Sequence, residues 1–256
     1  MTGASSGIGE ETARLLTAKG WSCVLVARRE DRLRVLAEEI GGEVELCDIG
    51  DRDAVSALGE RILARHPAIH LLVNNAGMPA RGTYLTVDPE LVERVMDVNY
   101  HGGVWCTRAL MPGLQEAASA GGAHVVNLVS VAGTVAFAPA GAYAAAKHAQ
   151  LAYSRSLAAA LRGSGISVHS VLPGFVETEG FPQKNVLKSG LLRRFVIYPP
   201  RVAEAILDAV EKGKREVTVP WFPYRLIGIA QAVAPGVVAR FVGMSDYKRG
   251  TSRLGR

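Results

Sequence analysis

The sequence contains few cysteines and few aromatic residues, and it has no hydrophobic run long enough to cross a membrane. The three cysteines, Cys23, Cys47 and Cys106, lack a CxxC spacing, which excludes a disulfide framework and predicts buried thiols in a reducing, cytoplasmic compartment. The longest apolar stretch, 226–239, is interrupted by a glutamine and a proline and is shorter than the roughly 20 residues that span a bilayer. A polar Gly/Ser run begins at Thr2, so no secretory leader is expected.

Charge is close to balanced outside the C-terminal end. The chain has 29 Lys and Arg against 24 Asp and Glu, a formal net charge of +5, and Lys248, Arg249, Arg253 and Arg256 supply four of these five charges. A nearly neutral body argues against nucleic acid as a partner, because a nucleic-acid footprint needs Lys and Arg gathered on a folded face. The histidines and cysteines show no zinc-type ligand spacing, so no metal site is expected.

Short apolar, β-branched runs alternate with longer helical patterns along the chain. Strands are expected at 22–27, 43–47, 69–73, 123–129, 166–172 and 216–219, and helices at 10–19, 51–65, 88–114 and 201–212. This rhythm predicts a single-domain α/β fold with a doubly wound parallel sheet over 1–220, followed by a C-terminal helical extension with a basic tail over 221–256. In such sheets a ligand lies beyond the carboxyl ends of the strands, so we expect the chemistry there.

A glycine-rich turn opens the chain. Gly3, Gly7 and Gly9 precede a predicted helix, and residues without a Cβ let backbone N–H groups at a helix N-terminus approach a pyrophosphate. An ordinary glycine-rich loop would show the same spacing. The segment 3–7 (GASSG) also matches the GxSxG elbow of serine hydrolases, but that elbow needs a preceding strand and normally lies deeper in the chain. We therefore prefer the phosphate-binding interpretation.

Four polar residues form a second pattern. Tyr143 and Lys147 are spaced i, i+4 and share one helix face, Ser130 ends an apolar strand, and Asn99 lies inside the predicted helix 88–114. A free phenol has a pKa near 10, and we expect the Lys147 ammonium to lower that of Tyr143. Tyr143 would then serve as a general acid and base, with Ser130 donating a hydrogen bond to a substrate oxygen.

Together these motifs resemble those of the short-chain dehydrogenase/reductase family, and the extended C-terminal end resembles that of its retinol- and hydroxysteroid-type members. The matching segments, in family order, are 2–9 (TGASSGIG), 74–77 (NNAG), Asn99, Ser130, Tyr143-x-x-x-Lys147 and Pro173-Gly174. The resemblance implies a Rossmann-like fold and an oxidoreductase that transfers a hydride between a nicotinamide cofactor and a carbonyl or alcohol. It also implies association as a homodimer or homotetramer through the helices that carry Asn99 and Tyr143.

The resemblance further assigns roles to individual residues. The catalytic set would be Asn99, Ser130, Tyr143 and Lys147, with Lys147 also holding the nicotinamide ribose and Asn99 anchoring a water that relays protons to it. Asp48 would contact adenine, and Pro173, Gly174, Val176 and Thr178 would surround the nicotinamide carboxamide. The full expected cofactor set is Gly3, Ser5, Ser6, Gly7, Ile8, Gly9, Arg28, Arg29, Asp48, Ile49, Asn75, Ala76, Gly77, Tyr143, Lys147, Pro173, Gly174, Val176 and Thr178.

The charged residues that follow the predicted strand 22–27, which corresponds to the second strand of the family, predict which cofactor is preferred. An acidic residue there normally meets the ribose 2′-hydroxyl of NAD, whereas an arginine accommodates a 2′-phosphate. In this chain Ala27 stands in the acid's place and Arg28 and Arg29 follow. We therefore expect NADP(H) rather than NAD(H), with Arg28 as the main contact and Arg29 as a secondary one.

The segment 177–200 lies where the family has its substrate loop. It contains several large apolar residues, namely Phe181, Val186, Leu187, Leu191, Leu192 and Phe195, which predict an apolar lid over a hydrophobic steroid-, retinoid- or long-chain-type substrate. The apolar extension after residue 220 would line the substrate site or make a peripheral membrane contact. Covering the sheet edge or forming a dimer remains an equal alternative for that extension.

One expected element is missing from the sequence. A strand should precede the glycine turn, but only Met1 does, and its absence would leave the edges of two neighbouring strands unpaired. We expect that the recorded start lies inside this first strand. The alternative is a truncated chain that is inactive or serves only in binding, although its candidate catalytic residues are all present.

Overall fold

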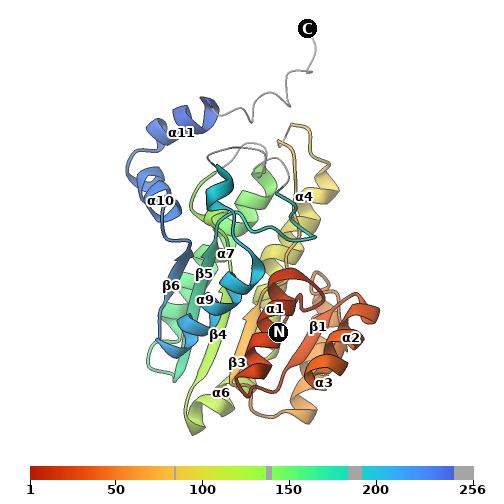
Figure 1. Cartoon of the computed structure of the whole chain (residues 1–256). Helices are drawn as coiled ribbons and strands as arrows, with labels where there is room; N and C mark the ends of the chain where they lie inside the picture. The colour runs from red at the N-terminus through yellow and green to blue at the C-terminus, as the bar shows by residue number, and fades with distance from the viewer. Residues whose placement is uncertain (84, 137–139, 184–191, 245–256) are drawn as a thin grey trace.

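Parallel strands with helices on both faces form the framework of the protein. The computed structural model describes residues 1–83, 85–136, 140–183 and 192–244 (Figure 1). The strands are β1 (Val24–Ala27), β2 (Glu43–Leu46), β3 (Leu71–Asn74), β4 (Ala123–Leu128), β5 (Ile166–Pro173) and β6 (Glu216–Val219). They form two parallel sheets, β1-β2 and β3-β4-β5-β6. The expected doubly wound α/β fold is confirmed.

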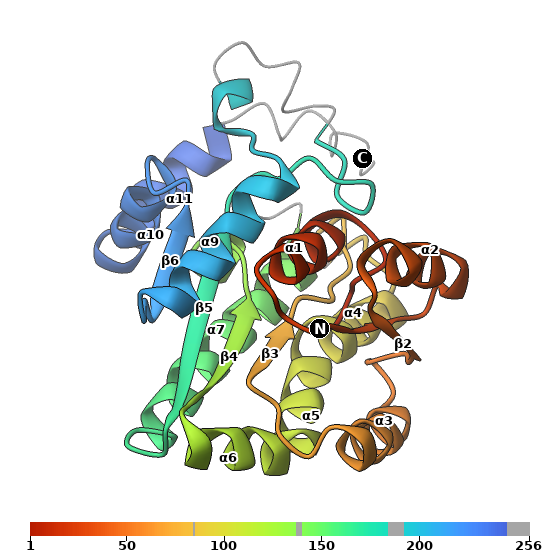
Figure 2. The same cartoon turned by 60° about the horizontal axis from the view of Figure 1, so that its bottom comes forward.

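The helices are α1 (Gly7–Ala18), α2 (Glu30–Ile40), α3 (Arg52–Arg65), α4 (Pro89–Met96), α5 (Gly102–Ala109), α6 (Met111–Ala120), α7 (Gly141–Ala160), α9 (Pro199–Glu211), α10 (Tyr224–Val233) and α11 (Pro235–Met244). Three single-turn elements are added to these, η1 (Asp97–His101), η2 (Val131–Gly133) and η3 (Leu192–Phe195). Figure 2 shows α1 and α9 packed side by side on one face of the strands, with α3, α5 and α6 on the other.

Neighbouring strand residues supply two apolar cores on opposite faces. Leu72 and Val125 face α3, α5 and α6, whereas Val73 and Val126 face α9. This alternation follows from the pleat of a strand, in which successive side chains point to opposite sides. Burial on both faces explains why these strands are mostly apolar.

The first residues of the chain lie in the gap between the two sheets. The Met1 amino group donates to Val24 O (2.7 Å), and Val26 N donates to Met1 O (2.9 Å), while Thr2 N donates to Val73 O (3.0 Å). Met1 and Thr2 thus pair with both β1 and β3 at the point where the missing strand was expected. The expectation of unpaired edges is wrong at this level of the sheet.

The predicted helix 88–114 is divided into several pieces. Asp88 caps its start, as expected, by accepting a hydrogen bond from Glu90 N (3.0 Å). The helix then widens into the π-helical turn η1 and ends at Ala109, and α6 begins with Pro112 in its first turn. A proline cannot donate to the preceding turn, and its ring clashes with the carbonyl four residues earlier, so a continuous helix cannot pass this point.

The C-terminal extension forms two short helices beside β6. Tyr224 at the start of α10 is buried, its hydroxyl donates to Phe195 O (3.2 Å), and Phe175 N donates to that hydroxyl (3.3 Å). Farther along, Leu226, Ile229 and several other large apolar side chains are exposed. Within the described part of the chain, no helix combines the length and apolar character needed to cross a membrane.

We expect the hydroxyl of Thr2 to contribute strongly to stability. It accepts hydrogen bonds from Asn75 N and Ala76 N, both at 3.1 Å, and the residue is almost fully buried. Thr2→Val keeps the shape but leaves both N–H groups without this acceptor, so it should lower the free energy of unfolding by about 1–3 kcal/mol. Urea denaturation measures this change. Thr2→Ser, which keeps the oxygen, should lose clearly less; an equal loss would contradict the role of the hydroxyl.

Candidate active site

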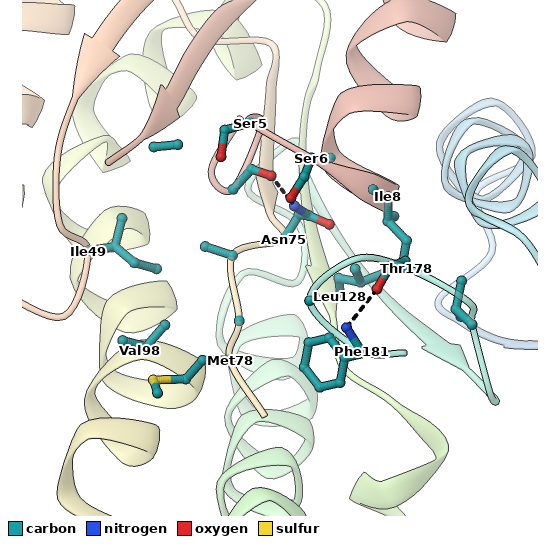
Figure 3. Close-up of a pocket in the computed structure, with 18 of the residues that line it drawn as sticks. Ser5, Ser6, Ile8, Ile49, Asn75, Met78, Val98, Leu128, Thr178 and Phe181 are labelled. Carbon is teal, nitrogen blue, oxygen red and sulfur yellow. Dashed lines mark hydrogen bonds between the residues drawn. The ribbon is translucent and has the colours of Figure 1, made fainter. Parts of the chain in front are cut away.

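A cavity opens at the carboxyl ends of the strands, between the glycine turn and the segment after β5 (Figure 3). Every residue of the expected cofactor set lines it, and so does Ser130. The structure thus brings together in one cavity motif residues that lie between Gly3 and Thr178 in the sequence. Their individual roles remain predictions.

The glycine turn owes its shape to close backbone approaches. Gly3 and Gly7 have φ angles of +68° and +59°, which favour glycine. A Cβ on Gly9 would lie 2.1 Å from Gly3 O, so no side chain fits there. Asn75 holds the turn from the end of β3, because its Nδ2 donates to Thr2 O (2.9 Å) and Gly3 O (3.1 Å). The turn leads directly into the N-terminus of α1, a geometry suited to binding the pyrophosphate of a dinucleotide.

The hydroxyl groups of this turn do not fit the serine-hydrolase alternative. Ser5 Oγ accepts from Arg29 Nε (3.1 Å) and Nη2 (3.0 Å), and Arg29 Nη2 also donates to Ser6 Oγ (2.5 Å). A nucleophilic serine needs a general base that accepts its proton, whereas a guanidinium can only donate. A guanidinium beside these hydroxyls instead favours a site for an anionic ligand.

Tyr143, Lys147 and Ser130 meet at the opposite end of the cavity. Tyr143 lies in the first turn of α7 and Lys147 one turn later, with Lys147 Nζ 5.8 Å from the centroid of the Tyr143 ring. Ser130 follows β4, and its Oγ accepts from Ala132 N (3.1 Å). The three side chains come from two elements, the end of β4 and the start of α7, that the sheet places next to each other.

Burial shifts the pKa values of two of these groups in opposite directions. It raises the pKa of Tyr143 to about 12, and the Ser130 hydroxyl beside it acts the other way. It lowers the pKa of Lys147 to about 7. The expectation that Lys147 lowers the pKa of Tyr143 is wrong for this structure, because burial of the phenol raises that pKa and the opposing effect comes from Ser130 rather than from Lys147. At neutral pH the phenol is therefore protonated, whereas the lysine is divided between its charged and neutral forms.

Lys147 is held by acceptors that the sequence did not indicate. Its Nζ donates to Leu128 O (2.9 Å) and to Gln150 Oε1 (2.8 Å), and all three groups are buried. Gln150 lies three residues after Lys147 on the same helix face, so the i, i+3 spacing could have identified it. Gln150 and the Leu128 carbonyl thus fix the position of the lysine amine.

Asn99 lies behind the cavity wall rather than on it. It sits in the π-helical turn, is 1% exposed, and pairs with the backbone of Met78 through Met78 N to Oδ1 (2.7 Å) and Nδ2 to Met78 O (2.9 Å). Single π turns are frequent at functional sites because they reorient one residue without ending the helix. This asparagine fixes the strand-end segment that borders Gly77.

The two arginines after β1 have different surroundings. Arg28 is 66% exposed, and its Nη1 lies 3.7 Å from Asp48 Oδ2. Asp48 also pairs with Arg94 and accepts from Gly50 N (3.0 Å), so it is committed to local contacts. Arg29 instead reaches the glycine turn. Arg28 is therefore the arginine that projects more freely into solvent at this end of the cavity.

The segment after β5 covers the tyrosine. The Phe181 ring lies 5.5 Å from that of Tyr143, centroid to centroid. Phe181 N donates to Thr178 Oγ1 (3.0 Å), as Figure 3 shows. Phe195, farther along, packs edge-on against Phe222. Of the other apolar lid residues, Val186, Leu187 and Leu191 lie outside the described residues, as does the side chain of Leu192.

Several further residues that the motifs did not indicate line the cavity, namely Met78, Val98, Leu128, Val129, Gly180 and Gln183. Met78, Val98 and Val129 directly flank a motif residue, which is the signal that could have found them. No described residue of α10 or α11 belongs to the lining. In the described ranges, no cluster of His, Cys, Asp and Glu is arranged to hold a metal ion.

We expect Gln150 to control the pKa of Lys147. Gln150→Leu removes an acceptor of the ammonium, which should lower that pKa below about 7, whereas Gln150→Glu adds an anion and should raise it. NMR titration of the lysine side chain measures both shifts directly. Identical titrations in the two variants would show that Gln150 does not stabilise the charged form.

Comparisons with known proteins agree with this geometry. The model of the family described as short chain dehydrogenase matches residues 1–186. Over 236 residues the chain is 32% identical to dehydrogenase/reductase SDR family member 7B of Danio rerio, covering 86% of this chain and 75% of that protein.

Two solved structures are also similar over almost their whole length. A short chain dehydrogenase from Burkholderia cenocepacia in complex with NADP has a TM-score of 0.78 at 27% identity, covering 94% of both chains. A short chain dehydrogenase/reductase from Burkholderia phymatum in complex with NAD has a TM-score of 0.78 at 25% identity, covering 91% of this chain and 92% of that one. The protein is therefore an oxidoreductase of the short-chain dehydrogenase/reductase family.

Proposed function

We propose that the protein interconverts a carbonyl and an alcohol with NADP(H), using Tyr143 as the general acid and base on a hydrophobic substrate. The observation that carries this proposal is the meeting of Tyr143, Lys147 and Ser130 in the cavity whose other end is the glycine turn. A nicotinamide cofactor supplies or accepts the hydride in this chemistry. The glycine turn at the N-terminus of α1 and the arginines beyond it suit the phosphates of such a cofactor.

Tyr143 is suited to protonate a substrate oxygen. With a pKa raised to about 12, the phenol carries its proton at neutral pH and can release it only to an oxygen on which negative charge develops. Ser130, at the end of β4, can donate to the same oxygen. Lys147, with its pKa lowered to about 7, exchanges protons near neutral pH and can return one toward the phenol. In the oxidation direction the proton moves the opposite way.

The preference for NADP(H) rests on the two arginines. Arg28 is exposed beside Asp48, and Arg29 donates to two hydroxyls of the glycine turn, so a cationic pair borders the end of β1. A 2′-phosphate would add charge-assisted hydrogen bonds that a 2′-hydroxyl cannot provide. Both cofactors occur among similar structures, one of which is a complex with NADP and another with NAD. The arginines favour the first.

The apolar surroundings of Tyr143 support a hydrophobic substrate. Phe181 covers the phenol ring, and the contact of Phe195 with Phe222 joins the end of the same segment to the extension. Exposed apolar side chains on 221–237 offer a surface for a second copy of the chain or for a peripheral membrane contact. Assembly as a dimer or tetramer and a cytoplasmic location remain predictions.

We expect Tyr143→Phe to abolish carbonyl reduction while leaving the fold intact. Loss of the proton donor should lower kcat by about 100-fold or more, with little change in cofactor binding. The assay follows NADPH oxidation with apolar ketones and aldehydes and with small polar ketones. Tyr153→Phe, on the same helix and outside the cavity lining, is the matched control.

If the wild-type protein reduces none of these compounds, a binding-only role replaces the proposal. If small polar ketones react as well as apolar ones, the proposed substrate class is wrong.

We expect Arg28→Ala to separate the two cofactors. Loss of a charge-assisted hydrogen bond should raise the KM for NADPH by about tenfold and leave that for NADH nearly unchanged. Steady-state kinetics with each cofactor measure the ratio. Arg34→Ala, which removes an exposed arginine paired with Glu30 on α2, serves as the control. Equal effects of Arg28→Ala on both cofactors would contradict the assignment.

A further inference from the structure

An acidic side chain from the segment after β5 reaches the arginines at the other end of the cavity. Glu179 accepts two hydrogen bonds from Arg32 on α2, one of them from Nη2 at 3.1 Å. The same carboxylate lies 3.6 Å from Arg29 Nη1. Residues nearly 150 positions apart in the sequence are thus joined across the mouth of the site.

The carboxylate carries its charge at neutral pH. Arg32 first, and Arg29 in addition, hold the pKa of Glu179 below its usual range. The side chain is 58% exposed, so water screens this interaction and other anions can reach the arginines. The contact is an exchangeable ion pair rather than a buried structural one.

Arg29 therefore has an anionic partner within the protein. Its Nε and Nη2 bind the Ser5 and Ser6 hydroxyls, and its Nη1 is the atom nearest Glu179. A ligand phosphate that approaches Arg29 meets a negative charge beside the guanidinium. The phosphate must displace that carboxylate or accept its repulsion, and either outcome weakens binding.

We propose that Glu179 is a specificity residue that competes with the 2′-phosphate of the cofactor for Arg29 and so limits the preference for NADP(H) over NAD(H). This inference rests on the proposed function, which places that phosphate at Arg28 and Arg29. A ligand without a 2′-phosphate does not compete for the arginine, so Glu179 leaves its affinity unchanged. The carboxylate acts on one cofactor and not on the other.

The test uses ligands that isolate the phosphate. Adenosine 2′,5′-bisphosphate and 5′-AMP differ only in the 2′-phosphate, and calorimetric titration gives their affinities without any catalytic assay. Glu179→Gln removes the charge and keeps the size of the side chain. The variant should bind the bisphosphate about threefold to fivefold tighter than wild type, the upper range for an exposed ion pair, with 5′-AMP unchanged.

A matched control removes the same charge nearby. Glu30 lies in the first turn of α2 next to Arg29 but pairs with Arg34, so Glu30→Gln tests the general effect of charge. Tighter bisphosphate binding in Glu179→Gln, beyond any change in Glu30→Gln, supports the inference. An equal change in both variants, or weaker binding in Glu179→Gln, overturns it.

The two proposals fail in different ways. If neither wild type nor Glu179→Gln binds the bisphosphate more tightly than 5′-AMP, the phosphate site at Arg28 and Arg29 is wrong. If both proteins prefer the bisphosphate by the same factor, the phosphate site stands and the competition by Glu179 is wrong.

Discussion

The contact between the glycine turn and the end of β3 is the interaction on which the rest of the site depends. Thr2 accepts from two backbone N–H groups after β3, and Asn75 returns two hydrogen bonds to the turn. This reciprocal pairing joins the β1-β2 sheet to the β3-β4-β5-β6 sheet at the place where Met1 and Thr2 lie between them. It also brings the N-terminus of α1 over the carboxyl ends of the strands, which makes one continuous cavity from two sheets.

Desolvation is the second organising effect, and it acts on the reacting end of that cavity. Burial raises the pKa of Tyr143 to about 12, so its phenol stays protonated, and lowers the pKa of Lys147 to about 7, so its amine is only partly charged at neutral pH. A neutral phenol is a proton donor, which matches reduction of a carbonyl. The arginines at the other end stay exposed and charged. The cavity thus has one end with buried titratable groups and another end with exposed cationic groups.

The segment after β5 contacts both ends. Glu179 lies on the arginines and Phe181, two residues later, lies on Tyr143. Gln183 closes the segment on itself, since its backbone N–H donates to Glu177 (2.6 Å). A short piece of chain therefore borders the anion site and the phenol at once, although the motifs place them far apart in the sequence.

The sequence by itself determined the strand positions, the parallel α/β class and the set of residues that would meet in one cavity. Apolar runs and glycine positions carry the strand positions and the fold class locally, because each depends on neighbours a few residues away. The set of cavity residues came in large part from the resemblance to the family. Only the tertiary structure decided where the long helix breaks, that Gln150 holds Lys147, that the pKa of Tyr143 rises, and that Glu179 reaches Arg29 and Arg32. Burial depth and contacts between distant segments set these features, since desolvation and ion pairing depend on what surrounds a group in space rather than along the chain.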